Sequence, residues 1–285
     1  MRAGVIGFCF SSALIAVSAA VSPVAAEEGA KPDDNLNAVL WDQTAVEAKA
    51  NAAAMFALAR IRLDQALADA SWTAAPAEQT GDFKNFPPAI VLDVDDTLLN
   101  TSNYQAWNVK AGTRFTPETW TKYVKAQVDT PIPGAIEFTQ YAASKGVKVF
   151  YVTNRTKEEE EPTVQLMTKL GFPAGGNVDT FLSAKEQPDW KSAKGTRRAV
   201  IAKDYRILLL VGDNLGDFTD AYKGTPEERE KVFAENAARW GHDWIVIANP
   251  TYGSFESAPY KSNYELSADE QRKLKIEALK SWDGQ

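Results

Sequence analysis

Two aspartates stand one residue apart directly after an apolar segment. Residues 89–92 are typical of a buried β-strand, and Asp93, Asp95 and Thr97 follow them. Side chains alternate along a strand, so a strand that continued would hold Asp93 and Asp95 on one face, roughly 6.5 Å apart. Two such carboxylates could divide the hydrolysis of a phosphate ester, one attacking phosphorus and the other protonating the leaving oxygen and then activating water. Turns that cap a helix show the same pattern, so the motif alone does not distinguish a phosphoryl-transfer site from a helix cap.

A second pair of carboxylates follows a second apolar segment. Residues 206–211 are followed by Gly212, by Asp213 and, four residues later, by Asp217. Mg²⁺ prefers hard oxygen ligands and is commonly held by one or two carboxylates together with a substrate phosphate. This pair therefore indicates a magnesium site, to which Asp93 could add a third ligand. The alternative is an Asx-rich turn in which glycines supply the positive φ angles.

Groups that could hold phosphate oxygens lie between these two segments. Thr153 comes near the end of the apolar segment that starts at Lys148, and its hydroxyl and the following N–H groups could bind a phosphoryl group. Lys191 and Lys194 lie in a loop that opens a helix, where an ammonium would balance the phosphoryl group and the crowded carboxylates. No one of these residues indicates a phosphate site by itself, because a threonine at a strand end usually caps the backbone and a surface lysine is usually solvated. Their order along the chain carries the argument.

The order of these elements resembles the haloacid dehalogenase superfamily of phosphohydrolases. An acid pair, a threonine, a lysine and a Gly-Asp-x-x-x-Asp segment appear in sequence, each at the end of a predicted strand or the start of a predicted helix. Four segments are further similar to the class C acid phosphatases, the lipoprotein e family of bacterial 5′-nucleotidases. They are residues 100–107, 150–155, 211–218 and 249–256. The resemblance extends from about Leu36 to the C-terminus.

The resemblance implies a role for each of the reactive residues. Asp93 would be the nucleophile that forms an aspartyl-phosphate, and Asp95 would be the general acid and then the general base. Thr153 and Lys194 would hold the phosphoryl oxygens. Lys194 lies one residue nearer to Asp213 than the spacing expected for the family, so Lys191 is a close competitor for the same role.

The resemblance also implies a metal site, and aromatic residues that follow two of the predicted strands suggest a substrate site. Mg²⁺ would be bound by Asp213 and Asp93 and by the main-chain carbonyl of Asp95, with Asp217 close behind through water. Aromatic rings near the active site could sandwich a planar base, which contributes about 1–3 kcal/mol per base, or they could pack a cap against the core. The predicted substrate-binding residues are Asn154, Arg155, Tyr104, Trp107, Tyr252 and Phe255.

The pattern of apolar segments predicts an α/β fold, a Rossmann-like parallel sheet with helices on both faces, plus a smaller helical cap and N-terminal helical region. The predicted domains are a signal peptide at 1–26, a helical region and linker at 27–88, and a haloacid dehalogenase-like core at 89–285 with a cap insertion at about 100–133. Helices are expected at 36–70, from Pro117 under a Thr116 cap, and at 134–145, 158–170, 194–202 and 226–240, with a last strand at 244–248.

The composition excludes several classes of protein. The chain has 285 residues, 45% hydrophobic and 24% charged, with a formal net charge of −7, which is typical of a globular protein and disfavours nucleic acid as a partner. It has a single histidine, His242, and a single cysteine, Cys9. Phosphohistidine phosphatases need a nucleophilic histidine in an arginine-rich setting, and zinc phosphatases need several imidazoles. His242 stands between Gly241 and Asp243, so we expect it to be a loop residue.

The N-terminus is typical of a targeting segment. Arg2 precedes an apolar stretch at 5–21, and small residues at 23–26 suit cleavage before Glu27. A retained transmembrane anchor is disfavoured because the stretch is rich in alanine and serine and lacks a basic flank. Cys9 follows a bulky phenylalanine and so lacks a lipobox, which departs from the lipoproteins of the family. We expect a periplasmic or secreted protein without a stable membrane anchor.

Three functions remain open from the sequence. The favoured one is an exported Mg²⁺-dependent acid phosphatase that acts on small phosphate monoesters, nucleoside 5′-monophosphates or nicotinamide mononucleotide, and a homodimer is compatible with it. A phosphotransferase or mutase is the second, because an aspartyl-phosphate can also be passed to a sugar hydroxyl. A non-catalytic phosphate-ester-binding protein is the third, and the presence of both Asp93 and Asp95 argues against it.

Overall fold

The computed structural model describes residues 34–284, which belong to one compact unit. The predicted signal peptide, its cleavage site and Cys9 lie outside the described residues. Among the helices of this described part, none is both long enough and apolar enough to cross a bilayer.

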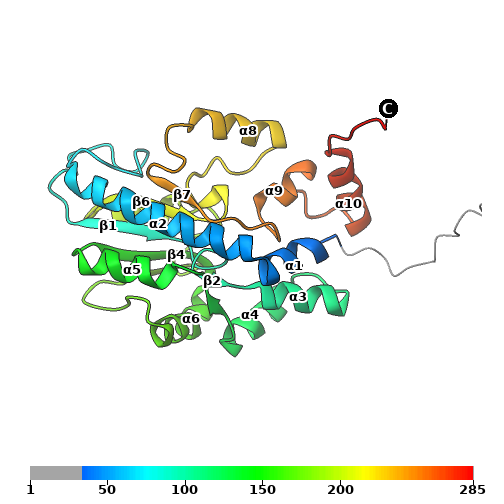
Figure 1. Cartoon of the computed structure of the whole chain (residues 1–285), viewed down its shortest axis with the longest axis horizontal. Coiled ribbons are helices and arrows are strands. Elements are labelled where there is room, and N and C mark those ends of the chain that lie inside the picture. The colour runs from blue at the N-terminus through cyan, green and yellow to red at the C-terminus, as the bar shows by residue number, and fades with distance from the viewer. Residues whose placement is uncertain (1–33, 285) are drawn as a thin grey trace, which may run out of the picture. The chain divides into compact units, whose positions relative to one another are not determined.

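A five-stranded parallel sheet forms the centre of the fold, as predicted (Figure 1). Its strand order is β5-β4-β1-β6-β7, and each pair of neighbours is parallel. The four-residue strand β5 was not predicted, because all four of its residues are buried and so short a segment shows no alternation of apolar and polar residues. The strands are β1 (Pro88–Leu92), β4 (Lys148–Thr156), β5 (Phe181–Ala184), β6 (Arg206–Gly212) and β7 (Trp244–Val246).

The strand order creates a crevice at one edge of the sheet. From β1 the chain adds β4 and β5 on one side, and then returns to add β6 and β7 on the other side. The loops after β1 and β6 therefore leave the sheet in different directions, and ligands of open α/β sheets bind in the crevice between such loops. These two loops carry the acid pair and the Gly-Asp-x-x-x-Asp segment.

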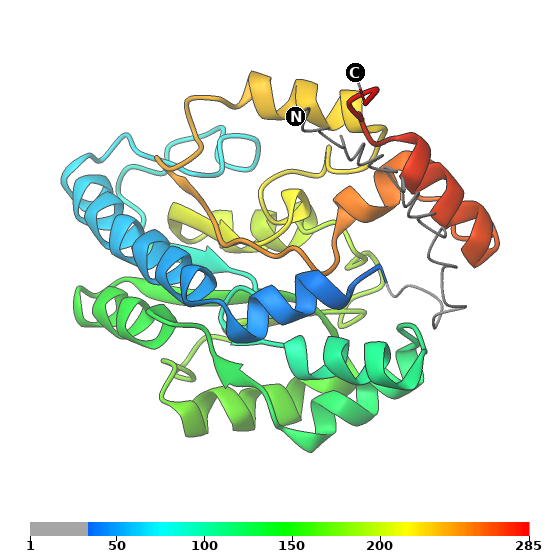
Figure 2. The same cartoon turned by 45° about the vertical axis from the view of Figure 1, so that its right-hand side comes forward.

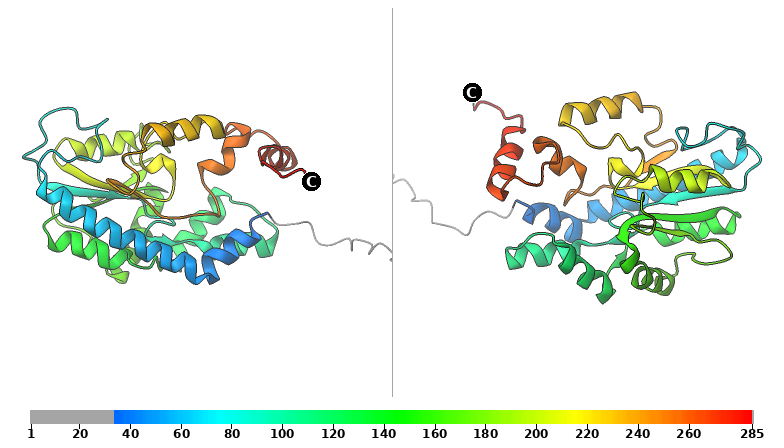
Figure 3. Two further views of the ribbon diagram at one scale, coloured as in Figure 1. Left: turned by 45° about the horizontal axis from the view of Figure 1, so that its top comes forward. Right: turned by 180° about the vertical axis from the view of Figure 1, so that it is seen from behind.

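Helices cover both faces of the sheet, as predicted. Figure 1 shows α2 and α5 on the near face, and the reverse view in Figure 3 shows the opposite face. Alternation along β1 divides its side chains between the two layers, since Ile90 packs in a core with Leu63 of α2, whereas Val91 packs in a core with Ile201 of α7. The covering helices are α2 (Val46–Ala68), α5 (Ala135–Ser144) and α6 (Lys157–Leu170) on one face and α7 (Gly195–Ala202) on the other.

The insertion after β1 is closed at its base by a two-stranded ribbon. Strand β2 (Leu99–Asn100) pairs antiparallel with β3 (Thr130–Pro131), and the two helices of the insertion lie between them. These helices are α3 (Ser102–Ala111) and α4 (Pro117–Ala126). Helix α4 begins at Pro117 as predicted, because the Thr119 N–H donates to the hydroxyl of the N-cap residue Thr116 at 3.2 Å.

Two of the predicted helices are wrong in extent. Residues 36–70 form two helices, α1 (Leu36–Thr44) and α2, because Ala45 is extended with ψ 128°. The break lets α1 turn away from the sheet and lie beside α3 (Figure 2), where Asn100 donates to Asp42 at 2.9 Å. Helix α8 (Pro226–Glu235) ends before Trp240, since the side chains of Asn236 and Trp240 bind carbonyls of its last turn.

The C-terminal segment adds short helices beyond the last strand, which ends at Val246 instead of Ala248. It contains α9 and the 3-10 helix η2, followed by the helix α10, and another 3-10 helix, η1, follows β6. Their bounds are η1 (Leu215–Asp217), α9 (Ser254–Ser257), η2 (Ala258–Tyr260) and α10 (Ala268–Glu277).

Packing of α2 against the sheet gives the first prediction. The side chain of Leu63 is fully buried, whereas Ile61 on the same helix is 56% exposed. Leu63→Ala should lower the free energy of unfolding by about 2–5 kcal/mol, and Ile61→Ala should change it by less than about 0.5 kcal/mol. Urea unfolding followed by circular dichroism measures both. Equal losses for the two variants would contradict the observed orientation of α2.

Candidate active site

The loop of residues 93–98 carries the predicted nucleophile, is called the nucleophile loop below, and begins directly after β1. The Asp93 N–H still donates to the Val211 carbonyl of β6 at 3.0 Å, which ties the start of the loop to the neighbouring strand. Because β1 ends at Leu92, both Asp93 and Asp95 lie in this loop, and strand alternation does not set their separation. Their side chains instead bind different cations. Asp93 is paired with Lys194 and Asp95 with Arg155.

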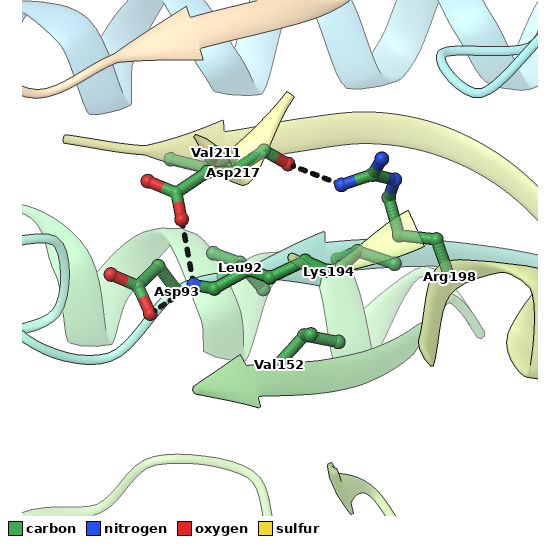
Figure 4. A pocket seen from close by; sticks show the side chains of 8 residues that line it. Leu92, Asp93, Val152, Lys194, Arg198, Val211 and Asp217 are labelled. Carbon is green, nitrogen blue, oxygen red and sulfur yellow. Dashed lines mark hydrogen bonds and ion pairs between the residues drawn. The ribbon is translucent and has the colours of Figure 1, made fainter. Parts of the chain in front are cut away.

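Lys194 lies at the centre of the acid cluster. Its ammonium nitrogen is 2.5 Å from Asp93 Oδ1 and 2.6 Å from Asp217 Oδ1 (Figure 4). Burial alone would lower the pKa of this lysine, but the two carboxylates outweigh burial and raise it, so the ammonium stays charged. Lys191, its competitor in the sequence, is exposed, and of these two lysines it is Lys194 that reaches the acids of the loops after β1 and β6.

Three carboxylates of the site converge closely enough to share a cation. One oxygen each from Asp93, Asp213 and Asp217 lies within 4.8 Å of the others. Asp213 is further held by the Asn249 amide at 2.8 Å and by the Thr97 hydroxyl at 3.3 Å. A set of anionic oxygens of this kind fits a hard divalent cation.

The electrostatics of the cluster also favour a bound cation. Burial raises the pKa of Asp213 well above its usual range, and repulsion from Asp217 and Asp93 raises it further. Burial also raises the pKa of Asp217, to about 6, although Lys194 opposes that shift. One lysine therefore does not balance the three acids, and a divalent cation would remove the remaining repulsion.

The turn after β6 needs glycine at its first position. A Cβ atom on Gly212 would lie 2.3 Å from the Cβ of Asp217, because the Asp217 side chain folds back over this residue. In that position Asp217 Oδ2 accepts from the Asn214 N–H at 2.9 Å. The buried Arg198 holds the same turn through the Asp217 main-chain carbonyl at 3.1 Å (Figure 4).

A second buried arginine of α7 joins the end of β4 to the loop that contains Lys191. The guanidinium of Arg197 donates to the Thr153 carbonyl, to the Asn154 side-chain oxygen at 2.8 Å and to the Lys191 carbonyl at 2.8 Å. Thr153 is buried beside the site, and Asn154 is exposed at its rim. The sequence did not indicate Arg197, because nothing local distinguishes a buried arginine from a solvated one.

Arg155 is not placed as predicted. Its side chain is fully buried and paired with Asp95 at 2.7 Å and with Asp129 at 2.8 Å, so it cannot reach a substrate in the site. Burial alone would lower the pKa of Arg155, but the two carboxylates raise it above its ordinary value. Burial likewise raises the pKa of Asp95, and Arg155 opposes that shift. The sequence did not indicate Asp129, because its partner Arg155 comes from a different element.

Asp96, in the same loop as Asp93 and Asp95, anchors two neighbouring segments. It has a positive φ of 51°, which aspartate tolerates better than most residues, and its side chain is buried. The N–H and hydroxyl of Thr101 donate to its carboxylate at 2.9 and 2.6 Å, and the Tyr252 hydroxyl bonds to the same group. Burial raises the pKa of Asp96 to about 7 against these hydrogen bonds.

The four predicted aromatic residues divide into buried and accessible rings. Tyr104 is only 2% exposed and packs against four other rings of the insertion, so the prediction that it stacks on a base is wrong. Tyr252 is half-buried beside Asp96. Trp107 and Phe255 are 45% and 47% exposed and retain an accessible face.

Comparisons with known proteins agree with this site. A family model described as HAD superfamily, subfamily IIIB (Acid phosphatase) matches residues 11–255. The chain belongs to this family. The class C acid phosphatase from Bacillus anthracis is 32% identical, with a TM-score of 0.77 over 87% of this chain and 98% of that chain. A structure of the class C acid phosphatase from Bacillus anthracis with tungstate bound gives 32% identity and a TM-score of 0.76 over the same shares.

Membership confirms several of the predictions made from the sequence. The resemblance to the haloacid dehalogenase superfamily and its class C acid phosphatases is confirmed, and with it the α/β fold. The chain is a phosphomonoesterase, and its substrates are small phosphate esters. Enzymes of this superfamily use a divalent metal, and the three converging carboxylates could bind one.

The acid cluster gives the second prediction. Adding millimolar Mg²⁺ to EDTA-treated protein should raise the melting temperature by several degrees, because binding to the folded state alone contributes about 2.7 kcal/mol at a hundredfold excess over Kd. Asp213→Asn should lose most of this increase. The control is Asp204→Asn. Asp204 is exposed and precedes β6, at the opposite end of the strand from Asp213, so this variant should keep the Mg²⁺-induced increase. A full Mg²⁺-induced increase in Asp213→Asn would contradict the assignment of the site.

Proposed function

We propose that this phosphatase is an exported, Mg²⁺-dependent enzyme that hydrolyses nucleoside 5′-monophosphates or nicotinamide mononucleotide through an aspartyl-phosphate on Asp93. The position of Lys194 carries the proposal. A buried ammonium that bridges Asp93 and Asp217 beside Asp213 would hold the nucleophile, would complement the metal and would face an incoming phosphoryl group. Tungstate is an oxyanion, and its presence in the related Bacillus anthracis enzyme supports an anion site in this fold.

In the first step, a carboxylate oxygen of Asp93 attacks phosphorus and the bond from phosphorus to the leaving oxygen breaks. Asp95 donates its proton to the departing oxygen, so that an alcohol leaves instead of an alkoxide. Burial raises the pKa of Asp95, which suits a residue that must carry a proton before the reaction. Lys194 and the Thr153 hydroxyl would hold the phosphoryl oxygens in this step.

In the second step, Asp95 is a carboxylate and takes a proton from water. The water oxygen attacks phosphorus, the bond from phosphorus to Asp93 breaks, and inorganic phosphate leaves with the Asp93 carboxylate restored. Asp95 then carries the proton needed for the next cycle. The two aspartates thus need different surroundings, which their separate pairing with Lys194 and Arg155 supplies.

Asp93, Asp213 and the main-chain carbonyl of Asp95 would hold Mg²⁺, with Asp217 close behind. A bound Mg²⁺ offsets the negative charge of the carboxylates and of the phosphoryl group, which must otherwise approach each other. Asn249 and Thr97 orient Asp213 for this purpose through their hydrogen bonds.

The choice of a nucleotide rests on two aromatic residues attached to the catalytic loops. Helix α3, which carries Trp107, begins directly after Thr101, and Thr101 is bonded to Asp96 of the nucleophile loop. Helix α9, which carries Phe255, begins at Ser254, whose hydroxyl donates to Asn214 of the loop after β6 at 2.5 Å. Both helices are therefore anchored at their starts to the loops after β1 and β6, and each ring has an accessible face that could stack on a base.

Export is part of the proposal and rests on the N-terminal sequence. The apolar stretch at 5–21 and the small residues before Glu27 suit a signal peptidase, and Cys9 lacks a lipobox. We expect the mature chain to begin near Glu27 in the periplasm or the medium.

The proposal is tested by phosphate release from nucleoside monophosphates, nicotinamide mononucleotide and an aryl phosphate, with and without Mg²⁺. Release without any added acceptor distinguishes hydrolysis from phosphotransfer or mutase activity. Transfer of phosphate only to an added sugar would replace the proposal by the phosphotransferase alternative.

The acid pair gives the third prediction. Asp93→Asn should abolish turnover and leave the fold intact, because an amide does not attack phosphorus. Asp95→Asn should slow kcat by about 10²- to 10⁴-fold through the loss of proton transfer. Asp204→Asn is again the control and should retain wild-type activity. Near wild-type phosphate release by purified Asp93→Asn would rule out the mechanism.

The exposed rings give the fourth prediction. Stacking stabilises ground state and transition state alike, so Trp107→Ala or Phe255→Ala should raise KM for a nucleotide by about tenfold to a hundredfold with little change in kcat. Ribose 5-phosphate has no base and should be hydrolysed as by the wild type. Phe233→Ala, which removes a similarly exposed ring from α8, is the matched control. An equal loss on the nucleotide and on the sugar phosphate would show that these rings support the fold of the site.

A further inference from the structure

Arg155 connects the nucleophile loop with three other parts of the fold. It extends from β4, and its Nε and Nη2 atoms donate to Asp95 Oδ1 at 2.9 and 2.7 Å. Nη2 also donates to Asp129 Oδ2 at 2.8 Å, and Nη1 donates to the Thr163 hydroxyl of α6 at 3.0 Å. The planar guanidinium is therefore held on two sides while it binds Asp95 on the third.

The bonds from Arg155 leave one oxygen of Asp95 available. Both donors bind Oδ1, and among the described residues none donates to Oδ2. The side chain of Asp95 is 14% exposed, in contrast to Arg155 and Asp129, whose side chains are fully buried. The arginine thus fixes the direction of the carboxyl group, and Oδ2 is the oxygen that can exchange a proton with a ligand.

Asp129 lies where the insertion rejoins the core. It stands between α4 and β3, and its carboxylate is covered by the insertion. The Tyr123 hydroxyl lies beside it, and burial together with this carboxylate raises the pKa of Tyr123, so the phenol stays neutral. The ring of Trp120 covers Arg155 from the same helix, with its centroid 5.8 Å from Cζ. The position of Arg155 therefore depends on the packed insertion.

We propose that Asp129 is a positioning residue that acts through Arg155 to hold Asp95 with Oδ2 directed toward the leaving oxygen. The inference rests on the proposed function, in which Asp95 Oδ2 gives its proton to that oxygen as the bond to phosphorus breaks. A fully buried guanidinium with a single carboxylate partner would be free to turn about that pair, whereas two carboxylates and a hydroxyl fix it.

This role predicts a dependence on the leaving group that a structural role alone does not. A nucleoside leaves as an alkoxide unless it is protonated, whereas 2,4-dinitrophenolate is stable enough to leave without a proton. The ratio kcat/KM reports the steps up to the release of the leaving group, so the later hydrolysis of the aspartyl-phosphate does not enter the comparison. Both esters are measured with Mg²⁺ present.

Asp129→Ala should lower kcat/KM for a nucleoside 5′-monophosphate by about tenfold to a hundredfold, and for 2,4-dinitrophenyl phosphate by less than about threefold. The matched control is Asp243→Ala. Asp243 is another buried aspartate paired with one arginine, Arg239 at 2.7 Å, and it precedes β7 at the sheet edge opposite the site. Its loss should lower the melting temperature and leave the ratio between the two esters unchanged.

A double variant separates action through Asp95 from a direct effect. When Asp95→Asn has removed the proton, adding Asp129→Ala should lower kcat/KM for the nucleotide by less than about twofold further. Losses that multiply in the double variant would overturn the proposal, and so would equal losses on the two esters in the single variant. If Asp129→Ala does not fold, the nearly isosteric Thr163→Val removes the other hydrogen-bond partner that supports Arg155. Its kcat/KM values for the two esters then test the proposal in the same way.

The experiment also separates this inference from the proposed function. A wild-type protein that releases phosphate from neither ester would contradict the proposed function itself. If the wild type hydrolyses both esters and Asp129→Ala lowers kcat/KM equally for the two, the inference alone is overturned.

Discussion

The active site depends on the compensation of buried carboxylates that crowd one edge of a parallel sheet. Asp93, Asp95, Asp213 and Asp217 all follow strands β1 and β6, and burial makes their mutual repulsion costly. Each of two buried cations is shared between two of the acids in this region. Lys194 bridges the two catalytic loops, and Arg155 joins the nucleophile loop to the insertion. A divalent metal would complete this balance of charge.

Sharing the cations gives the two aspartates of the nucleophile loop different chemistry. Asp93 faces an ammonium that can also contact a phosphoryl group, which suits a nucleophile. Asp95 faces a guanidinium that is tied to Asp129 and Thr163 and stays with the protein, which suits a group that must give and take a proton in a fixed direction. In the proposed mechanism the same residue type therefore serves two roles because its partners differ, as is common at catalytic sites.

The supporting structure is built from hydrogen bonds between loops and not from the sheet alone. Arg197 joins the end of β4 to the loop of Lys191, Arg198 holds the turn of Asp217, and Ser254 ties α9 to that turn. Each loop at the edge of the sheet is thus fixed by a neighbour, so the substrate contacts are set by elements distant in sequence. A site held in this way keeps its geometry better than one on free loops.

The sequence by itself determined the parallel sheet and the family, and it indicated the acids that gather after β1 and β6, because apolar strands that end in acids are local patterns. Only the tertiary structure decided three further features. These are the packing of α1 against α3, the burial of Tyr104, and the pairing of Lys194 instead of Lys191 with Asp93. The sequence also predicted that Arg155 binds the substrate. That prediction failed because its partners Asp129 and Thr163 come from other elements. Whether a charged residue meets a ligand or another buried charge depends on contacts between distant segments, and no local pattern encodes them.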